Sequence, residues 1–421
     1  MSAASLQKEI DRIAASAREA AETLAGASQK QINAALKAMA ALLVREKARI
    51  QTENGKDIAA ARKKGLSAAM IDRLMLSDRA FKSMIDGLTV VAGLSSPVGA
   101  RCDARVRPNG LRIYKMRVPI GVVCIIYESR PNVTVDAAAI CLKSQNAVIL
   151  RGGSESFHSN RILTALFSRA LDKVGLPGCA VQAPATTDRA AVAMLLAKEN
   201  AIDVVIPRGG ESLIRAVVSQ SRIPVIKHYK GVCHVYVSRH AGMAIALPIV
   251  INAKVQRPGV CNAMETLLID AGLPLRHKKA LVGGLLDKGV TLFGDPAARK
   301  LSPAVKKATV DDWYAEYLDL RCAVRVVNGV REAIDHINTY GSRHTDAIVT
   351  RSKAEAALFR DRVDSSSVMI NASTRFSDGG EYGMGCEIGI STDKLHARGP
   401  MGVDDLTTYK WVVEGKGQIR G

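Results

Sequence analysis

Aromatic residues are scarce in this 421-residue chain, at 4% of the sequence, although hydrophobic residues as a whole make up 48%. The chain carries a net charge of +19, but its basic residues alternate with acids and form no long block of lysine and arginine. Nucleic-acid-binding surfaces typically combine a basic stripe with aromatic side chains on which bases stack. Binding of DNA or RNA is therefore the less favoured prediction, and small anionic ligands explain the charge better.

The chain also lacks a long apolar run and any C-x-x-C pair. The longest apolar run, residues 243–253, is too short to cross a bilayer. Lys8, Glu9 and Asp11 stand where a signal peptide has its apolar segment. The eight cysteines are widely spaced and indicate neither a disulfide framework nor a metal site. We therefore expect a soluble, cytoplasmic protein with no membrane partner and no metal.

What is present points to an α/β protein of two domains. Residues 5–95 show helical stripes, such as Leu6, Ile10 and Ile13, and carry no catalytic pattern. Strands and helices then alternate in two blocks, which predicts two parallel sheets. The expected strands are residues 122–126, 147–150, 203–206 and 235–237 in the first block and 265–269, 346–350 and 367–370 in the second.

A hairpin interrupts this pattern. Residues 105–107 and 111–117 flank Pro108-Asn109-Gly110, which is a strong turn signal between two strands. The last segment, residues 407–421, alternates in polarity and could pair with this hairpin or with another subunit.

Two similar phrases, LRGGSES at 150–156 and PRGGES at 207–212, each follow an expected strand and precede an expected helix. A glycine turn at that place lets backbone approach a ligand, and the N–H groups of the first helical turn favour an anion. Either turn alone could be an ordinary turn with a surface arginine, because short glycine motifs are common. Two of them favour a nucleotide site.

Cys261 differs from the other cysteines because Pro258 and Gly259 break the helix just before it. A cysteine on an irregular turn can present its sulfur to a ligand, and Arg257 together with free backbone N–H groups would favour the thiolate, the nucleophilic form. The alternative is a small buried apolar side chain. The residues alone leave both interpretations open.

Four stretches carry a resemblance to a known family: YESRPNV at 127–133, QRPGVCN at 256–262, NASTRF at 371–376 and KLHARGPMG at 394–402. On them the chain resembles the aldehyde dehydrogenase superfamily over nearly its whole length, and within it the branch that reduces glutamyl phosphate. The resemblance implies an aldehyde dehydrogenase-like α/β fold with two Rossmann-type parallel-sheet domains. The implied parts are an NADPH-binding domain in 1–104 and 120–240, a catalytic cysteine domain in 241–392, and a hairpin and C-terminal oligomerisation element in 105–119 and 393–421.

The implied activity is NADPH-dependent reduction of L-glutamyl 5-phosphate to L-glutamate 5-semialdehyde with release of phosphate, a step of proline biosynthesis. The resemblance also implies a homo-oligomer and functional coupling to the glutamate 5-kinase that supplies the unstable substrate. A CoA-dependent aldehyde dehydrogenase of the same superfamily is the alternative, and a comparison of glutamyl phosphate with acyl-CoA as donors separates the two. A basic nucleic-acid-binding protein, the third candidate, would leave Cys261 without a task.

The resemblance also assigns roles to individual residues. Cys261 is the nucleophile, and Asn132 with the Cys261 backbone N–H forms the oxyanion pocket, although Asn132 follows Pro131 and is equally well explained as a turn residue. The other assignments are Arg151, Gly152, Gly153, Ser154, Arg208, Gly209, Gly210 and Glu316 for the cofactor and Arg130, Arg257, Ser373, Arg375 and Arg398 for the substrate. Glu316 could equally be one more exposed acid, and any single arginine is commonly an ion-pair partner.

One departure from the superfamily bears on mechanism. Hydrolytic members place a glutamate base in the sequence Glu-Leu-Gly-Gly, whereas this chain has Lys-His-Tyr-Lys-Gly at 227–231. The missing carboxylate suits a reductase, because a base that activates water would hydrolyse the thioester. His228 has two interpretations, acid–base work or a polar turn residue, and the second is favoured.

Overall fold

The computed structural model describes residues 2–420, and the chain divides into two compact units. Unit 1 comprises the residues up to Lys227, Gly383–Gly389 and the residues from Met401 on, and unit 2 comprises His228–Tyr382 and Ile390–Pro400. The change of unit falls between Lys227 and His228, so His228 belongs to the same unit as Cys261. The assignment of a separate function to each domain stays a prediction.

The N-terminal part of the chain, up to Gly93, is helical, as the apolar stripes predict. Leu6, Ile10 and Ile13 are all buried. Ser2, Ser28 and Ser77 accept hydrogen bonds from backbone N–H groups and so fix where their helices begin. The helices are α1 (Ala3–Ala25), α2 (Gln29–Arg45), α3 (Lys47–Lys63), α4 (Ala68–Leu74) and α5 (Asp78–Gly93).

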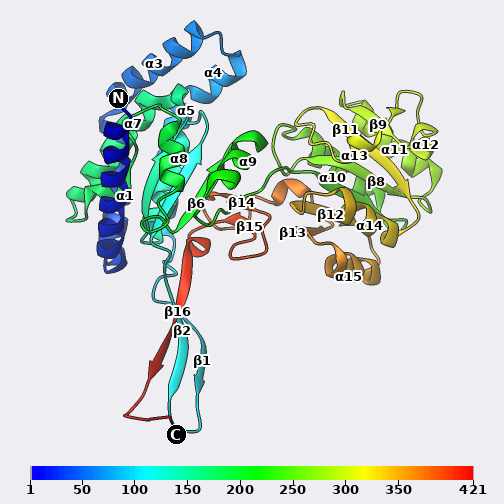
Figure 1. Ribbon diagram of the computed structural model, residues 1–421. Coiled ribbons are helices and arrows are strands. Elements are labelled where there is room, and N and C mark those ends of the chain that lie inside the picture. The colour runs from blue at the N-terminus through cyan, green and yellow to red at the C-terminus, as the bar shows by residue number, and fades with distance from the viewer. Residues whose placement is uncertain (1, 421) are drawn as a thin grey trace. The chain divides into compact units, whose positions relative to one another are not determined.

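Unit 1 is built on a four-stranded parallel sheet in the order β5-β4-β3-β6. Figure 1 labels β6, its edge strand. Its central strands are fully buried runs of aliphatic residues, which suits a sheet covered on both faces. Helices α6 and α7 pack against each other, and α1 packs against α8. The elements are β3 (Val122–Tyr127), α6 (Asn132–Lys143), β4 (Ala147–Arg151), α7 (Phe157–Asp172), β5 (Val181–Gln182), α8 (Ala190–Leu196), β6 (Val204–Arg208) and α9 (Glu211–Gln220).

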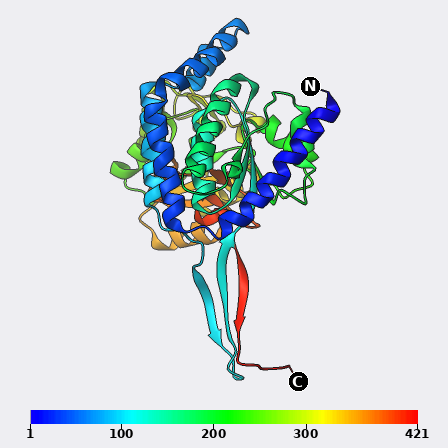
Figure 2. The same ribbon diagram turned by 90° about the vertical axis from the view of Figure 1, so that its left-hand side faces the viewer.

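A three-stranded antiparallel ribbon, β1-β2-β16, also belongs to unit 1, and its strands lie side by side in Figure 2. β1 (Arg101–Val106) and β2 (Arg112–Pro119) are the expected hairpin. β16 (Thr407–Glu414) pairs with β2 along its whole length. The predicted pairing of the C-terminal segment with the hairpin is therefore present.

Unit 2 is built on a seven-stranded sheet in the order β10-β9-β11-β8-β7-β12-β13, with parallel pairs throughout. Two buried clusters, one on Val235 and Leu267 and the other on Tyr236 and Leu268, show that alternate residues of β7 and β8 face opposite sides of the sheet. The strands are β7 (Cys233–Val237), β8 (Met264–Asp270), β9 (Thr291–Gly294), β10 (Lys306–Lys307), β11 (Arg321–Val327), β12 (Thr345–Val349) and β13 (Ser367–Ile370). The helices are α10 (Met243–Val255), α11 (Leu275–Leu286), α12 (Pro296–Arg299), α13 (Val310–Trp313), α14 (Val330–Tyr340) and α15 (Lys353–Arg362).

Two short strands, β14 (Gly389–Ser391) and β15 (Gly399–Met401), form a sheet of their own. Among the described residues, no helix is both long enough and apolar enough to cross a membrane.

Candidate active site

Cys261 lies on the irregular loop between the end of α10 at Val255 and the start of β8 at Met264, where the sequence predicts it. Its side chain is half-buried, and the neighbouring Asn262 is buried and donates a hydrogen bond to the Ser377 carbonyl over 2.8 Å. The loop is therefore anchored directly beside the sulfur.

Gly231 holds the other side of this loop. A Cβ at Gly231 would lie 2.5 Å from the carbonyl carbon and the Cα of Cys261, and closer still to its carbonyl oxygen. The Gly231 N–H donates to the Glu316 carboxylate over 2.9 Å. Only a residue without a side chain fits here. Gly231, held by its hydrogen bond to Glu316, therefore fixes the position of the Cys261 backbone.

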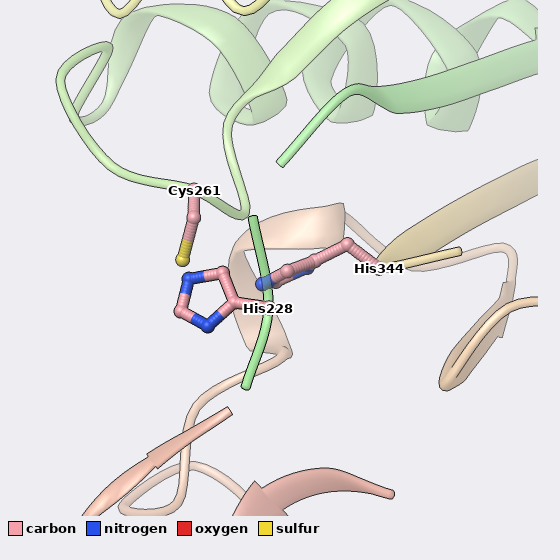
Figure 3. A group of neighbouring side chains, drawn as sticks. All are labelled: His228, Cys261 and His344. Carbon is pink, nitrogen blue, oxygen red and sulfur yellow. The ribbon is translucent and has the colours of Figure 1, made fainter. Parts of the chain in front are cut away.

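Two histidines stand next to the sulfur. His228, Cys261 and His344 each contribute one ligand-type atom, and these three atoms lie within 4.8 Å of one another. Figure 3 shows one ring nitrogen of His228 turned toward the Cys261 sulfur, with the His344 ring beside it. The two rings are 5.6 Å apart between centroids.

The topology explains why three residues so far apart in sequence meet. His228 precedes β7, Cys261 precedes β8 and His344 directly precedes β12, and these three strands are neighbours in the order β8-β7-β12. The amino ends of parallel strands share one edge of a sheet. Ligands in open α/β sheets usually bind at the carboxyl ends of the strands, so the placement of Cys261 at the amino edge departs from that rule.

A buried ion pair lies under the Cys261 loop. Lys254, in the last turn of α10, and Glu265, at the start of β8, approach to 2.7 Å with both side chains fully buried. Glu265 also accepts the Leu318 N–H over 3.2 Å. Burial raises the pKa of Glu265 to about 7 against the opposing pull of Lys254. The pair ties both ends of the loop to the segment that carries Glu316.

Three of the predicted substrate residues lie together, because Arg375 interacts with Cys261 and Arg257, and Ser373 bonds to the backbone of Arg375. The Nε–H of Arg375 donates a hydrogen bond to the side chain of Gln256 over 2.8 Å. Burial, together with the nearby Arg257, lowers the pKa of Arg375, although Cys261 opposes the shift. The hydroxyl of Ser373 is already used, because it accepts the Arg375 N–H and so caps a short 3₁₀ turn.

Arg398, the fourth predicted substrate residue in unit 2, already forms an ion pair. Its Nη2 atom forms an ion pair of 2.7 Å with Asp364, which also pairs with Lys394. The contact with Asp364 shows a structural use of this guanidinium. Arg130, the fifth candidate, lies in unit 1 on the loop between β3 and α6.

Asn132 belongs to unit 1 and is the first residue of α6, not part of a strand end. Its amide donates to Asp136, one helical turn further on, over 3.2 Å. Burial raises the pKa of Asp136 to about 6, against opposing effects of Asn132 and Arg208. The side chain of Asn132 is thus held by a helix neighbour.

The first glycine turn follows β4. Arg151 ends that strand, is 8% exposed, and donates to the backbone carbonyls of Gly152, Thr187 and Asp188. A Cβ on Gly152 would strike Asn160 of α7, and one on Gly153 would strike Glu155. A Cβ fits at either position only if these side chains move. Ser154 donates to the adjacent Glu155.

Beside this turn is a cavity of about 350 Å³ within unit 1. Arg151, Gly152 and Gly153 line it, together with two further arginines, Arg12 of α1 and Arg161 of α7. A concave site with several guanidinium groups suits a phosphorylated ligand.

The second glycine turn joins β6 to α9. Gly210 is the N-cap of α9, and its N–H donates to the Glu128 carboxylate over 3.0 Å. The turn therefore already accepts an anionic group from the chain itself, as the helix N-terminus favours. Arg208 donates to the Ile388 carbonyl, so it contacts the Gly-x-Gly-x-Glu-x-Gly element at 383–389.

Comparison with known proteins agrees with this architecture. The model of the "Aldehyde dehydrogenase family" matches residues 2–314. The chain belongs to the aldehyde dehydrogenase family. It is accordingly an oxidoreductase, and the two parallel-sheet units are the aldehyde dehydrogenase-like fold predicted from the sequence.

Within the family, curated relatives share one name. γ-Glutamyl phosphate reductase of Geobacter metallireducens is 53% identical over 415 residues, 99% of each chain, and that of Desulfatibacillum aliphaticivorans is 53% identical over 408 residues, 97% of this chain and 98% of the other. The crystal structure of γ-glutamyl phosphate reductase from Thermotoga maritima is 42% identical, covers 98% of this chain and 100% of its own, and has a TM-score of 0.96. An engineered glycolyl-CoA reductase with bound NADP+, 15% identical with a TM-score of 0.68, covers 96% of each chain and shows the shared fold.

Sequence reasoning missed His344, Glu128 and the Lys254–Glu265 pair. His344 stands far along the chain from Cys261, and only the strand order brings it close. Lys254 and Glu265 are charged residues inside apolar runs, and that pattern was the one sequence signal for a buried ion pair.

Proposed function

We propose that this protein reduces L-glutamyl 5-phosphate to L-glutamate 5-semialdehyde with NADPH, through a thioester on Cys261. The observation that carries the proposal is Cys261 itself, half-buried on a loop held from both sides, beside Arg257 and Arg375. The names of the relatives and of the Thermotoga maritima structure support the substrate.

In the first step the Cys261 sulfur attacks the acyl carbon. The S–C bond forms and the bond from carbon to the phosphate oxygen breaks, so that phosphate leaves with its electron pair. Arg375 lies close enough to Cys261 for their charges to interact, and Arg257 lies close to Arg375. Guanidinium groups are suited to phosphate and carboxylate oxygens. We assign the departing phosphate and the substrate carboxylate to these two arginines, with Arg130 and Ser373 as further candidates. Arg398 is the weakest candidate because it is paired with Asp364.

NADPH, when bound, supplies a hydride to the thioester carbon. The oxygen of that carbon becomes negative, and collapse of the hemithioacetal expels the Cys261 thiolate and yields the aldehyde. The backbone N–H of Cys261 and the Asn132 side chain are our candidates for holding that oxygen. One such donor typically contributes about 3 kcal/mol to lowering the barrier.

The residues of unit 1 fit a phosphorylated nucleotide. Arg12, Arg151 and Arg161 line one cavity, and cationic groups there favour a 2′-phosphate, which distinguishes NADPH from NADH. The glycine turns at 152–154 and 208–210 supply close backbone approach, and the Gly210 N–H already donates to a carboxylate. Glu316 of unit 2 is assigned to the nicotinamide ribose, although one of its oxygens accepts the Gly231 N–H.

The segment from Lys227 to Gly231 contains no carboxylate, and His228 of that segment faces Cys261. Without a carboxylate base to activate water, the thioester persists long enough for hydride transfer. This supports a reductase over a hydrolytic dehydrogenase.

The deciding experiment measures turnover of glutamyl phosphate that glutamate 5-kinase and ATP generate in the same assay. The loss of NADPH absorbance reports the turnover. The wild type should consume NADPH and release phosphate, and Cys261→Ser should fold normally and show no turnover. Cys102→Ser, at an exposed thiol of the ribbon, is the matched control and should behave as the wild type. Reduction of acyl-CoA donors in place of glutamyl phosphate would refute the assigned substrate in favour of a CoA-dependent enzyme. A salt-dependent shift on nucleic acid, with Cys261→Ser harmless to proline-free growth, would refute the enzyme altogether.

We also propose a homo-oligomer built on the ribbon. Tyr409, Trp411 and Val413 of β16 are exposed on a strand whose outer edge pairs with nothing among the described residues. Exposed aromatic strands of this kind mark interaction surfaces. Sedimentation of the wild type against Trp411→Lys tests it, and a monomeric wild type would refute it. Coupling to glutamate 5-kinase stays a prediction, tested by co-sedimentation of the two enzymes.

A further inference from the structure

We propose that His228, Cys261 and His344 together form a binding site for Zn²⁺, which reversibly blocks the Cys261 sulfur. The three come from the amino ends of adjacent strands, and their ligand-type atoms lie within 4.8 Å of one another (Figure 3). Among residues 2–420, no other three or more His, Cys, Asp or Glu side chains bring their ligand-type atoms close enough to hold a metal ion.

The donor set suits this ion. Zn²⁺ takes thiolate sulfur at about 2.3 Å and imidazole nitrogen at about 2.0–2.1 Å in tetrahedral geometry. Such bonds place neighbouring ligand atoms roughly 3.3–3.6 Å apart. Small side-chain rotations therefore bring the three atoms from their present spacing to that of a zinc site, and a fourth position stays open for water.

Both imidazoles are oriented as metal ligands usually are, with the other ring nitrogen held by a hydrogen bond. The Nδ1 atom of His228 is 2.9 Å from the Ile390 carbonyl, which can only accept, so Nδ1 is the hydrogen-bond donor of this ring. The Nδ1 atom of His344 is 2.9 Å from the Thr345 hydroxyl. Its Nε2 atom is fully buried and has no hydrogen-bond partner in the described part of the chain.

Arg375 lies near Cys261, with Arg257 beside it, and their positive charges weaken the attraction of the site for a cation. We therefore expect an exchangeable ion and not a permanent structural one.

Zinc binding would occupy the electron pair with which Cys261 attacks. The inference does not depend on the proposed substrate, because it concerns the free enzyme. It predicts that any reaction of the Cys261 thiolate, including simple alkylation, is slowed by the ion and restored by a chelator.

The test uses metal-free full-length protein titrated with Zn²⁺ by calorimetry, and the rate at which iodoacetamide modifies Cys261, followed by mass spectrometry. We expect one zinc ion bound through Cys261 per chain and at least a tenfold slower alkylation, reversed by EDTA. Co²⁺ in place of Zn²⁺ should give a thiolate-to-metal charge-transfer band that is absent in Cys261→Ser. Unchanged alkylation in saturating zinc, or equal zinc affinity of wild type and Cys261→Ser, would overturn the inference.

Matched variants separate ligands from bystanders. His228→Asn and His344→Gln should each weaken zinc binding at least tenfold. His240→Gln at an exposed histidine and Cys102→Ser at an exposed thiol should leave it unchanged. Because His344 is buried, circular dichroism checks its fold, and the half-buried His228 provides the decisive variant if His344→Gln unfolds. A protein that binds zinc at Cys261 but fails to reduce glutamyl phosphate would refute the proposed function and leave this inference standing.

Discussion

Gly231→Ala is the sharpest perturbation of the Cys261 loop. The added methyl group would lie 2.5 Å from the Cys261 carbonyl carbon and Cα, whereas real Cβ contacts are essentially never below 3.0 Å. Neither side yields easily. The Cys261 carbonyl accepts from the Cys233 thiol, Asn262 is bonded to Ser377, and the Gly231 N–H is bonded to Glu316.

Relief of this clash requires a shift on the order of 1 Å at the nucleophile, and a misplacement of that size typically costs about 100-fold in rate. We expect kcat for glutamyl phosphate reduction to fall about 100-fold, with about 1–3 kcal/mol of stability lost to overpacking. Steady-state kinetics and urea unfolding measure the two effects.

The control is Gly283→Ala in α11, where nothing lies within 4 Å of the added Cβ. That variant should keep full activity and gain about 0.4–1 kcal/mol, because alanine restricts the unfolded chain. A Gly231→Ala enzyme with activity within threefold of the wild type and unchanged stability would refute the argument that this contact positions Cys261.

Three further outcomes are expected. Lys254→Met should lower the free energy of unfolding in urea by about 3–5 kcal/mol, because it leaves the Glu265 carboxyl buried without its partner. The double variant Lys254→Met/Glu265→Leu should recover most of that loss. A loss below about 1 kcal/mol in the single variant would contradict this. Asp136 keeps its proton in the folded state up to a pKa of about 6, against an ordinary 3.8, so the stability it contributes falls as pH rises from about 4 to 6, and Asp136→Asn should flatten that slope in unfolding curves. Arg398→Ala should lose about 1 kcal/mol with the Asp364 contact and keep the wild-type KM for glutamyl phosphate, whereas a tenfold rise in KM would assign Arg398 to the substrate.

The fold was largely predictable because its signals are local. Buried aliphatic runs marked β3, β4, β7, β8 and β12 to within a few residues, and apolar stripes marked α1 and α2. β9 and β11 were missed because Thr291–Gly294 is short and Arg321–Val327 carries arginines at both an end and an interior position.

The candidate site was predictable only where chain breakers stood next to chemistry, as Pro258 and Gly259 do at Cys261. His344 was not, because its partners depend on a strand order that no local pattern encodes. The sequence favoured a polar turn residue at His228, and the structure places its ring beside the Cys261 sulfur, so an acid–base role stays a prediction. Arg398 was chosen for its charge, and only the fold shows that charge opposed by Asp364.

The order in which the ribbon is assembled has a consequence for synthesis. β2 leaves the ribosome long before β16, the strand that covers one of its edges. Until β16 is made, that edge stays open to pairing with other strands. A nascent chain stalled before Thr407 should therefore depend on chaperones far more than a finished one.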